Sequence, residues 1–214
     1  MNRRIVLLGP PAAGKGTQAA LIREHYGIPT VSTGAILRSE KTAGTELGEA
    51  AERFTREGRL FPDAIALQFV EKWIDQNGVE FVLDGFPRTL SQAEALFALL
   101  AKKAVTLGVV IAFEVTEETI RKRVLRRMVC EKCEYVESAD VAARTDFRCP
   151  KCNGLLTRRK DDTLEALRNR MIEYRVRTEP LIEYYRRRGF LVQVESERAP
   201  KVVFRKVSEI VDRL

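Results

Sequence analysis

The sequence predicts an α/β fold in which helices cover both faces of a parallel β-sheet. Short apolar runs alternate with segments of helical periodicity along the chain. A glycine-bounded loop joins the first apolar run to the first helical segment. The 214 residues, 45% of them hydrophobic, are enough for one core with an inserted lobe or two. Alternation of this kind indicates parallel strands, because a crossover helix must return the chain to the same edge of the sheet.

Five strands and the helices between them can be assigned in order. The expected strands are 5–8, 30–32, 80–84, 106–115 and 190–194. Glycine and proline mark helix ends and starts, and the expected helices are 14–26, 45–57, 63–77, 89–103, 117–127, one or two over 163–188, and 200–213. Segment 128–158 is rich in turn residues and indicates a small insert. Because carboxyl ends of parallel strands meet at one edge, we expect one cleft to collect Gly9, Ser32, Asp84 and the residues after Val115.

The loop after the first strand has the pattern of a phosphate-binding loop. Residues 9–17 read Gly-Pro-Pro-Ala-Ala-Gly-Lys-Gly-Thr, between a strand and a helix start. Gly9 and Gly14 permit backbone dihedrals that a Cβ would block, so that successive N–H groups can point inward at a helix N-terminus. Lys15 adds a charge that can reach the outer phosphates. An ordinary βα turn with a surface lysine is the alternative, and the strand–loop–helix context argues against it.

An acid and several arginines are the other candidates for phosphate chemistry. Asp84 ends an apolar strand, where its carboxylate can hold Mg²⁺ through water, although a β-turn capped by aspartate is the competing interpretation. Arg123 and Arg127 are four residues apart, which places them on one face of the expected helix. With Arg159 and Arg170 they can grip a phosphoryl group from several sides. Most charged runs are solvated surface, and we assign that role to Arg126, Arg158, Arg168, Arg175 and Arg177.

Four cysteines form two C-x2-C pairs separated by fifteen residues, at Cys130, Cys133, Cys149 and Cys152. Four thiolates can close a tetrahedral structural metal site, for which zinc is the expected ion and iron or cobalt are alternatives. Buried free thiols, redox pairs and disulfides are the other interpretations. No histidine flanks the cluster, and four sulfurs leave no open position for catalysis.

The remaining composition narrows the cellular setting. A net charge of +7 and a pI near 9.4 suit anionic ligands, either nucleotides or nucleic acid. The basic residues cluster instead of forming an aromatic-rich tail, which favours a discrete anion site. No apolar run approaches the roughly 18 residues of a membrane span, and Met1 to Arg4 lead directly into a strand without a signal-peptide pattern. We therefore expect a cytoplasmic protein with no membrane or nucleic-acid partner.

From about residue 3 to 214 the chain resembles adenylate kinases of the long-lid, zinc-containing bacterial type, within the P-loop nucleoside monophosphate kinases. The matching segments are 9–17, Ser32-Thr33-Gly34 with Arg38, 84–89 with Gln92, Arg123 and Arg127, the four cysteines, Arg159-Lys160-Asp161-Asp162, and Arg170. The resemblance implies a P-loop NTPase-type sheet of order 2-3-1-4-5 and a monomer. It implies a core of residues 1–31, 62–123 and 164–214, a lobe for the monophosphate at 32–61, and a lid at 124–163 that carries the metal.

The resemblance also implies an activity, reversible phosphoryl transfer from ATP to AMP giving two ADP, with Mg²⁺ and a structural Zn²⁺. Implied ATP-binding residues are Gly9, Pro10, Ala12, Ala13, Gly14, Lys15, Gly16, Thr17, Arg123 and Arg127. Implied AMP-binding residues are Thr33, Arg38, Arg59, Phe61, Gly85, Arg88, Gln92, Arg159 and Arg170. Implied catalytic residues are Lys15, Arg88, Arg123, Arg127, Arg159 and Arg170. Asp84 would hold Mg²⁺ waters, and Asp161 and Asp162 would pair with arginines as the lid closes.

Two residues depart from the family pattern. Many relatives have aspartate after Ser-Thr-Gly, where this chain has Ala35, so we expect weaker Mg²⁺ binding and a larger share of that task for Asp84. Ala12 replaces a usual glycine, and its methyl group should be tolerated only if its φ is negative. The single histidine, His25, is expected on the surface. The lack of a candidate catalytic histidine does not argue against phosphoryl transfer, because a phosphate acceptor is already ionised and needs no general base.

Three alternative functions remain at this point. The acceptor can be another monophosphate, such as UMP, CMP or a deoxynucleotide. A zinc-ribbon protein that binds nucleic acid would explain the charge and the cysteines but would leave the phosphate loop unexplained. A nucleotide sensor without turnover would keep Lys15 but should lack the ring of arginines.

Overall fold

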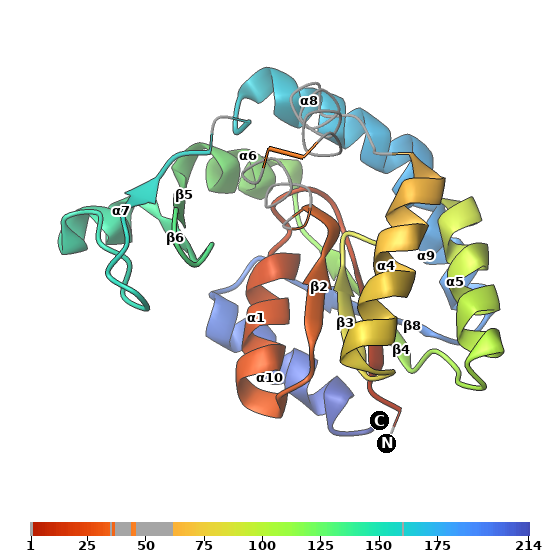
Figure 1. The fold of residues 1–214 in the computed structure, drawn as a ribbon. Helices are drawn as coiled ribbons and strands as arrows, with labels where there is room; N and C mark the ends of the chain where they lie inside the picture. The colour runs from red at the N-terminus through yellow and green to blue at the C-terminus, as the bar shows by residue number, and fades with distance from the viewer. Residues whose placement is uncertain (1, 35, 37–43, 46–61, 160) are drawn as a thin grey trace.

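A computed structural model of the chain describes residues 2–34, 36, 44–45, 62–159 and 161–214. Five strands form one parallel sheet in the order β2-β3-β1-β4-β8 (Figure 1). They are β1 Arg4–Leu8, β2 Thr30–Ser32, β3 Phe81–Asp84, β4 Val109–Glu114 and β8 Leu191–Glu195. Since β8 is the fifth strand of this sheet, the α/β class and the implied order 2-3-1-4-5 are confirmed.

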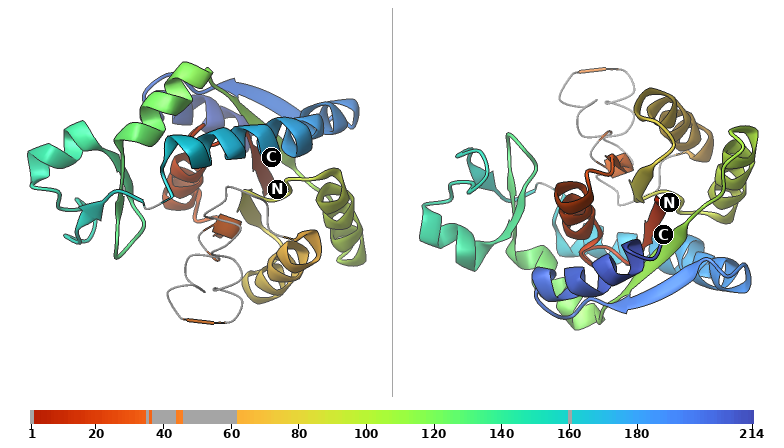
Figure 2. Two further views of the ribbon diagram at one scale, coloured as in Figure 1. Left: turned by 90° about the horizontal axis from the view of Figure 1, so that it is seen from above. Right: turned by 90° about the horizontal axis from the view of Figure 1, so that it is seen from below.

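Helices pack on both faces of the sheet, as Figures 1 and 2 show. On one face lie α1 (Lys15–Tyr26) and α10 (Pro200–Val211), and on the other lie α4 (Asp63–Asn77), α5 (Leu90–Lys102) and α9 (Pro180–Arg187). Side chains of β1 alternate between the two faces. Ile5 and Leu7 pack in the core under α1 and α10, and Val6 and Leu8 pack in the core under α4, α5 and α9. Burial on both faces explains why the strands appear in the sequence as continuous apolar runs.

A small lobe stands apart from the main sheet, at the left of Figure 1. Helix α6 (Glu117–Arg126) leads into it, and its strands β5 (Arg127–Cys130), β6 (Val136–Ser138) and β7 (Leu156–Thr157) form an antiparallel sheet in the order β6-β5-β7. Helix α7 (Ala139–Ala142) and a 3₁₀ turn (Ala143–Thr145) complete it. The predicted insert at 128–158 is therefore a folded lobe whose core is Met128, Cys130, Ala142, Cys149 and Leu156.

Some element boundaries differ from the predictions. The helix expected at 63–77 has those bounds, whereas the strand expected at 106–115 is shorter, Val109–Glu114. The segment 163–188 contains α8 (Leu164–Glu173), a π-helix (Tyr174–Thr178) and α9. A π-helix has no separate periodicity signal in the sequence, because it is set by packing around the wider turn. The helix expected at 45–57 lies outside the described residues.

Candidate functional site

The loop between β1 and α1 lies at the carboxyl end of the central strand. Gly9 has φ +143°, and a Cβ there would lie 2.9 Å from the carbonyl oxygen of Phe113. Gly14 has φ +96° and is the N-cap of α1. The first N–H groups of α1 have no partner within the helix, so the loop ends at a set of donors suited to an anion. The structure therefore requires both glycines where the motif predicts them.

Lys15 places its ammonium within this loop. Its Nζ donates to the carbonyl oxygens of Gly9, at 2.7 Å, and Pro10, at 2.8 Å. An ammonium has three donors, so one is left for a phosphate. Burial is the main cause that lowers the pKa of Lys15, Asp84 opposes it, and Arg88 and Arg127 add to it, so that the pKa lies at about 8. The charge of Lys15 is thus held where water screens it poorly.

We expect ATP affinity to fall as the pH rises through about 8, because the lowered pKa means that the free protein loses the Lys15 ammonium there. Below that pH the charge is present, and above it binding must take up a proton. Calorimetric titrations from about pH 7 to pH 10 would measure this. In a Lys15→Arg variant the group stays charged, so its weaker affinity should be flat over that range. An equal decline in both proteins would contradict the assignment.

Ala12 adopts a left-handed conformation, with φ +58°. The condition set from the sequence, that an alanine is tolerated here only with a negative φ, is therefore not met. The loop turns here, with the Ala13 N–H donating to the Pro10 carbonyl at 3.2 Å, and the Ala12 carbonyl accepting from Arg123 Nη1 at 3.3 Å. The loop makes these contacts with Ala12 at positive φ, so the alanine methyl is accommodated under strain.

Replacing Ala12 by glycine should stabilise the protein by about 1 kcal/mol, since glycine adopts positive φ without the steric cost. For a chain of this size, that corresponds to a rise in melting temperature of about 2–4 °C. Ala13 is the matched control, because it is buried and has no positive φ. Ala13→Gly should lower the melting temperature. A destabilised Ala12→Gly variant would show that the strain is absent.

Asp84 and Gly85 bring the end of β3 against the loop. A Cβ on Gly16 would lie 3.2 Å from Asp84 Oδ2, so this glycine lets the carboxylate approach the start of α1. Gly85 has φ +81°, and its carbonyl accepts from Thr33 Oγ1 at 2.9 Å and from Arg88 Nε at 2.8 Å. The segment 84–88 therefore joins the phosphate loop, the end of β2 and an arginine at one edge of the sheet.

Arg88 lies deep in this region. Burial lowers the pKa of its guanidinium, Arg170 lowers it further, and Asp84 opposes the shift. The backbone N–H of Arg88 donates to Gln92 Oε1 at 2.7 Å, and the backbone carbonyl of Arg88 accepts from Thr178 Oγ1 at 2.9 Å. Thr178 was not among the predicted site residues. Its only sequence signal is a hydroxyl just before Pro180, which does not reveal a contact 90 residues away.

Arg123 connects the phosphate loop to the segment after β8. Its guanidinium donates to the carbonyl oxygens of Ala12 and Ser196. Of the other loop residues, Pro10 and Ala13 are buried, and Thr17 is half-buried in the first turn of α1. Arg123 and the loop residues that are predicted to bind ATP are thus neighbours in space.

The position of Arg127 corrects the prediction that Arg123 and Arg127 share one face of a helix. Arg127 does not continue the helix of Arg123, because α6 ends at Arg126 and Arg127 opens β5 with φ −69° and ψ 128°. Its Nε and Nη2 both donate to Asp162, with Nε at 2.7 Å from Oδ2. Arg170 pairs with Asp161 and lies 3.7 Å from Asp162. The chain leaves the helix where the small lobe begins, which turns Arg127 toward this pair of acids.

The two acids are largely shielded from solvent. The Asp162 side chain is 4% exposed. Burial opposes ionisation of Asp161, but Arg170 and then Arg159 outweigh it, so the pKa of that carboxyl lies below its ordinary value. Opposite charges this close favour the ionised pair strongly. Arg127 and Arg170 therefore form ion pairs with the two carboxylates that precede α8, and Arg159 lies near enough to lower the pKa of Asp161. Arg38, Arg59 and Phe61, together with Ala35, lie outside the described residues.

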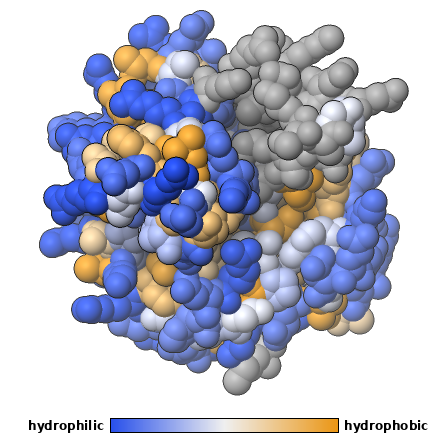
Figure 3. All heavy atoms as spheres, turned by 60° about the vertical axis from the view of Figure 1, so that its left-hand side comes forward, coloured by the Kyte–Doolittle hydropathy of each residue, from blue (hydrophilic) through white to orange (hydrophobic). Residues whose placement is uncertain are grey.

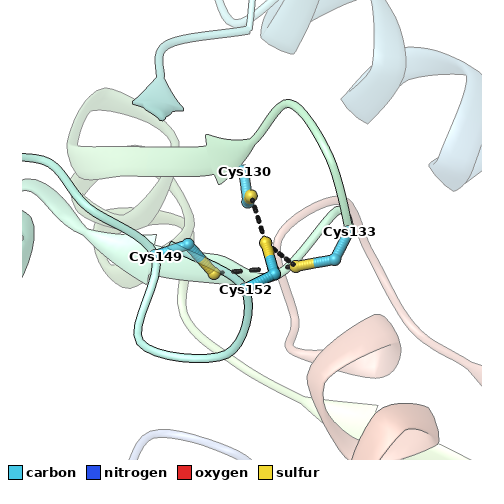
Figure 4. Close-up of side chains that lie close together, drawn as sticks. All are labelled: Cys130, Cys133, Cys149 and Cys152. Carbon is cyan, nitrogen blue, oxygen red and sulfur yellow. Dashed lines mark hydrogen bonds between the residues drawn. The ribbon is translucent and has the colours of Figure 1, made fainter. Parts of the chain in front are cut away.

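The four cysteines converge in the small lobe (Figure 4). Their sulfurs lie within 4.8 Å of one another, with neighbouring Sγ atoms 3.3 to 3.6 Å apart. A tetrahedral site with metal–sulfur bonds of about 2.3 Å has sulfur–sulfur distances of about 3.8 Å. No disulfide joins them. The donor set and its spacing therefore fit one metal ion held by four thiolates.

Both C-x2-C pairs are built by the same turn. The carbonyl of Cys130 accepts from Glu134 N–H at 3.0 Å, and that of Cys149 accepts from Asn153 N–H at 2.9 Å. Glu134 and Asn153 have φ +57° and +56°. A Cβ on Gly154 would lie 2.9 Å from Cys130 Sγ, so this position needs a glycine. The repeated turn explains how the spacing in the sequence brings each pair of sulfurs to one point.

The electrostatics of the cluster also favour a cation. Burial opposes ionisation of Cys130, but the backbone N–H groups of Cys133 and Lys132 lower its pKa to about 7. Burial raises the pKa of Cys133, and the neighbouring sulfurs raise it further. Four close thiolates repel one another unless a cation lies between them.

Comparison with known proteins places this geometry in a family. Residues 7–190 match the family model described as adenylate kinase. The chain belongs to the adenylate kinase family. It is 41% identical over 213 residues to an adenylate kinase of Archaeoglobus fulgidus, covering 98% of each chain. The corresponding protein of Thermodesulfovibrio yellowstonii is 38% identical over 213 residues, covering 98% of this chain and 99% of its own.

An adenylate kinase of Magnetococcus marinus is 44% identical over 196 residues, which is 90% of this chain and 92% of the relative. These matches confirm the resemblance inferred from the motifs, and with it the prediction of an enzyme, a phosphotransferase. Family membership also explains why the phosphate loop, the acids and the arginines lie at the same edge of the sheet. It argues against the zinc-ribbon and sensor alternatives.

Proposed function

We propose that this chain transfers the terminal phosphoryl group of ATP to AMP, reversibly, giving two ADP. The observation that carries the proposal is the convergence of Asp84, Arg88, Arg123 and Arg127 around Lys15 and its glycine-bounded loop. A phosphate acceptor is already ionised, so the protein must only align two phosphates and stabilise the charge of the transition state. The described residues supply cations for that purpose.

On the donor side, the loop amides and Lys15 would hold the phosphates of ATP, with Arg123 beside them. The proposed donor residues are Gly9, Pro10, Ala12, Ala13, Gly14, Lys15, Gly16, Thr17, Arg123 and Arg127. Asp84 would bind the waters of Mg²⁺, which accompanies ATP in this family. The close approach of the Asp84 carboxylate to Gly16, at the start of α1, supports this role.

On the acceptor side, Thr33, Gly85 and Gln92 would lie near the adenine of AMP, and Arg88 on its phosphate. The hydrogen bonds from Thr33 and Arg88 to the Gly85 carbonyl support a common subsite. Arg38, Arg59 and Phe61 are proposed for the same subsite from the resemblance. Residues 32–61 would form a lobe over it, with the core at 1–31, 62–123 and 164–214.

The lid, residues 124–163, would close over the nucleotides and exclude water. Arg123, Arg127, Arg159 and Arg170 would then surround the transferred group, with Asp161 and Asp162 holding arginines as the lid moves. The ion pairs of Arg127 and Arg170 with these acids support that role.

A structural zinc ion would be held by Cys130, Cys133, Cys149 and Cys152. When bound, it would supply cross-links between the two turns and no chemistry at the phosphates. The lobe buries a core of five residues, and Figure 3, with this side turned forward, shows hydrophilic residues interspersed with hydrophobic patches. Free thiols as ligands suit a reducing compartment, which supports a cytoplasmic location.

Other partners receive less support. Among the described residues, no helix is both long and apolar enough to cross a bilayer. Several arginines that could contact nucleic acid are paired with acids. We propose a monomer, as the family resemblance implies. UMP, CMP and deoxynucleotides remain the alternative acceptors.

Coupled assays with ATP, Mg²⁺ and each monophosphate test the proposal. AMP should be the preferred acceptor, with two ADP formed for each ATP and AMP consumed. Absence of ADP from purified protein given ATP, AMP and Mg²⁺ would overturn it, and a preference for UMP or CMP would support the alternative.

A further inference from the structure

Asp63 lies at the start of α4, at a position where the sequence suggests only a helix start after Pro62. Its Oδ2 accepts from Thr89 Oγ1 at 2.7 Å, and its Oδ1 accepts from Gln92 Nε2 at 2.7 Å. The carboxylate thus joins the N-terminus of α4 to that of α5. Hydrogen bonds to an ionised acceptor are the stronger kind, so this contact is more than ordinary helix capping.

The contact belongs to a closed ring of hydrogen bonds. Gln92 Oε1 accepts from the Arg88 N–H at 2.7 Å, and Thr89 Oγ1 accepts from the Gln92 N–H at 3.1 Å. Gln92 is 3% exposed. A reversed carboxamide would place oxygen against the Asp63 carboxylate and NH₂ against the Arg88 N–H. The ring therefore allows one orientation of Gln92.

The ring is connected to the backbone of Arg88 through Gln92. Its N–H is held by Gln92, while its carbonyl is held from the opposite side by Thr178 and its Nε by Gly85. Arg88 cannot shift without breaking one of these bonds. A displacement of a charged group by about 1 Å can cost roughly 10²-fold in rate, so rigid support of this arginine has kinetic value.

We propose that Asp63 is a positioning residue for the acceptor subsite: acting through Gln92, its carboxylate fixes the main chain that carries Arg88. The inference rests on the proposed function, in which Arg88 holds the phosphate of AMP. Asp63 touches neither nucleotide in this account. Its effect should therefore appear in the kinetics of AMP and be small for those of ATP.

Asp63→Ala tests this against a matched control, Asp75→Ala. Asp75 is an exposed acid on the same helix, and it pairs with Lys103 just after α5, so it also joins α4 to α5. Asp63→Ala should lower kcat/KM for AMP by about 10- to 100-fold, with KM for ATP within about twofold of the unchanged protein. Asp75→Ala should change neither. Equal AMP kinetics in the two variants would overturn the proposal.

A reversed pair separates positioning from general destabilisation. When Asp63→Asn is combined with Gln92→Glu, the new amide at position 63 can donate to the new carboxylate at position 92. The other oxygen of that carboxylate can still accept from the Arg88 N–H. Gln92→Glu alone places two carboxylates against each other, so this single variant should disturb the ring most. The double variant should restore slow hydrogen exchange of the Arg88 amide, and exchange as fast as in the single Gln92→Glu variant would contradict the ring.

Hydrogen exchange of the Arg88 amide, measured without nucleotide, provides a readout independent of turnover. It should accelerate in Asp63→Ala, stay slow in Asp75→Ala, and slow again in the double variant. If the unchanged protein does not phosphorylate AMP, the proposed function fails, whereas this exchange still reports on the ring. Unchanged Arg88 exchange in Asp63→Ala refutes the positioning role even when AMP is turned over normally.

Discussion

Replacing Lys15 by methionine is expected to lower kcat by about three orders of magnitude, which corresponds to about 4 kcal/mol of transition-state stabilisation. The Lys15 ammonium is held over the phosphate loop by two carbonyl oxygens, and its remaining donor can follow the phosphoryl group during transfer. Methionine has a similar length but no charge or donor. Because the transferred group carries its charge into a buried site, water cannot replace the lost cation.

Rates of ADP formation with saturating ATP and AMP measure the loss. Lys122→Met is the matched control, because Lys122 is an exposed lysine on α6 that pairs with Glu118 and lies next to Arg123. It should retain nearly all activity. Methionine at position 15 leaves two loop carbonyls without their donor, so thermal melts must accompany the assay. Near-normal turnover in a folded Lys15→Met protein would show that the loop does not carry the chemistry.

Removing the metal from the four-cysteine cluster should produce the largest change in stability. Structural zinc contributes on the order of 10 kcal/mol to small domains that fold around it, and the lobe core has only five buried residues. We expect chelation, or Cys130→Ser, to lower the melting temperature by about 10 °C or more, with the lobe unfolding first. Cys130 is chosen because it is 1% exposed and a poorer ligand there cannot be replaced by water easily.

Metal content by mass spectrometry and hydrogen exchange along the chain would check this expectation. Exchange should accelerate across 127–157 while the five-stranded sheet stays protected. Asp140→Asn is the control, since Asp140 is an exposed residue of the same lobe that pairs with Arg126. That variant should keep its metal and its melting temperature. An unchanged melt after confirmed loss of the metal would mean that the cluster has no structural role.

Much of the architecture could be predicted because its signals are local. The loop around Lys15 combines strand, glycines and helix start within thirteen residues, and the C-x2-C pairs encode their own turns. Helix 63–77 begins after a proline and ends before a glycine, and its bounds were correct. Parallel strand ends meet at one edge, so the grouping of Gly9, Ser32 and Asp84 also followed from strand order, as the register of β1, β2 and β3 confirms.

The remaining features depend on contacts between distant segments. Periodicity continued the helix through Arg127, but the entry into the small lobe and the pairing with Asp162 bend the chain there. From the sequence, alanine at position 12 is tolerated only with a negative φ, whereas in the folded loop it adopts φ +58°. The π-helix that brings Thr178 to Arg88 is likewise set by packing.

For this protein, the sequence by itself determined the fold class, the phosphate loop, the four-cysteine cluster and the family. Those properties reside in short segments, where spacing and residue type restrict the backbone directly. Only the tertiary structure decided which acid holds which arginine and that Asp63 joins Gln92 to the main chain of Arg88. Such pairings depend on distances of a few ångströms between residues far apart in the chain, which no local pattern encodes.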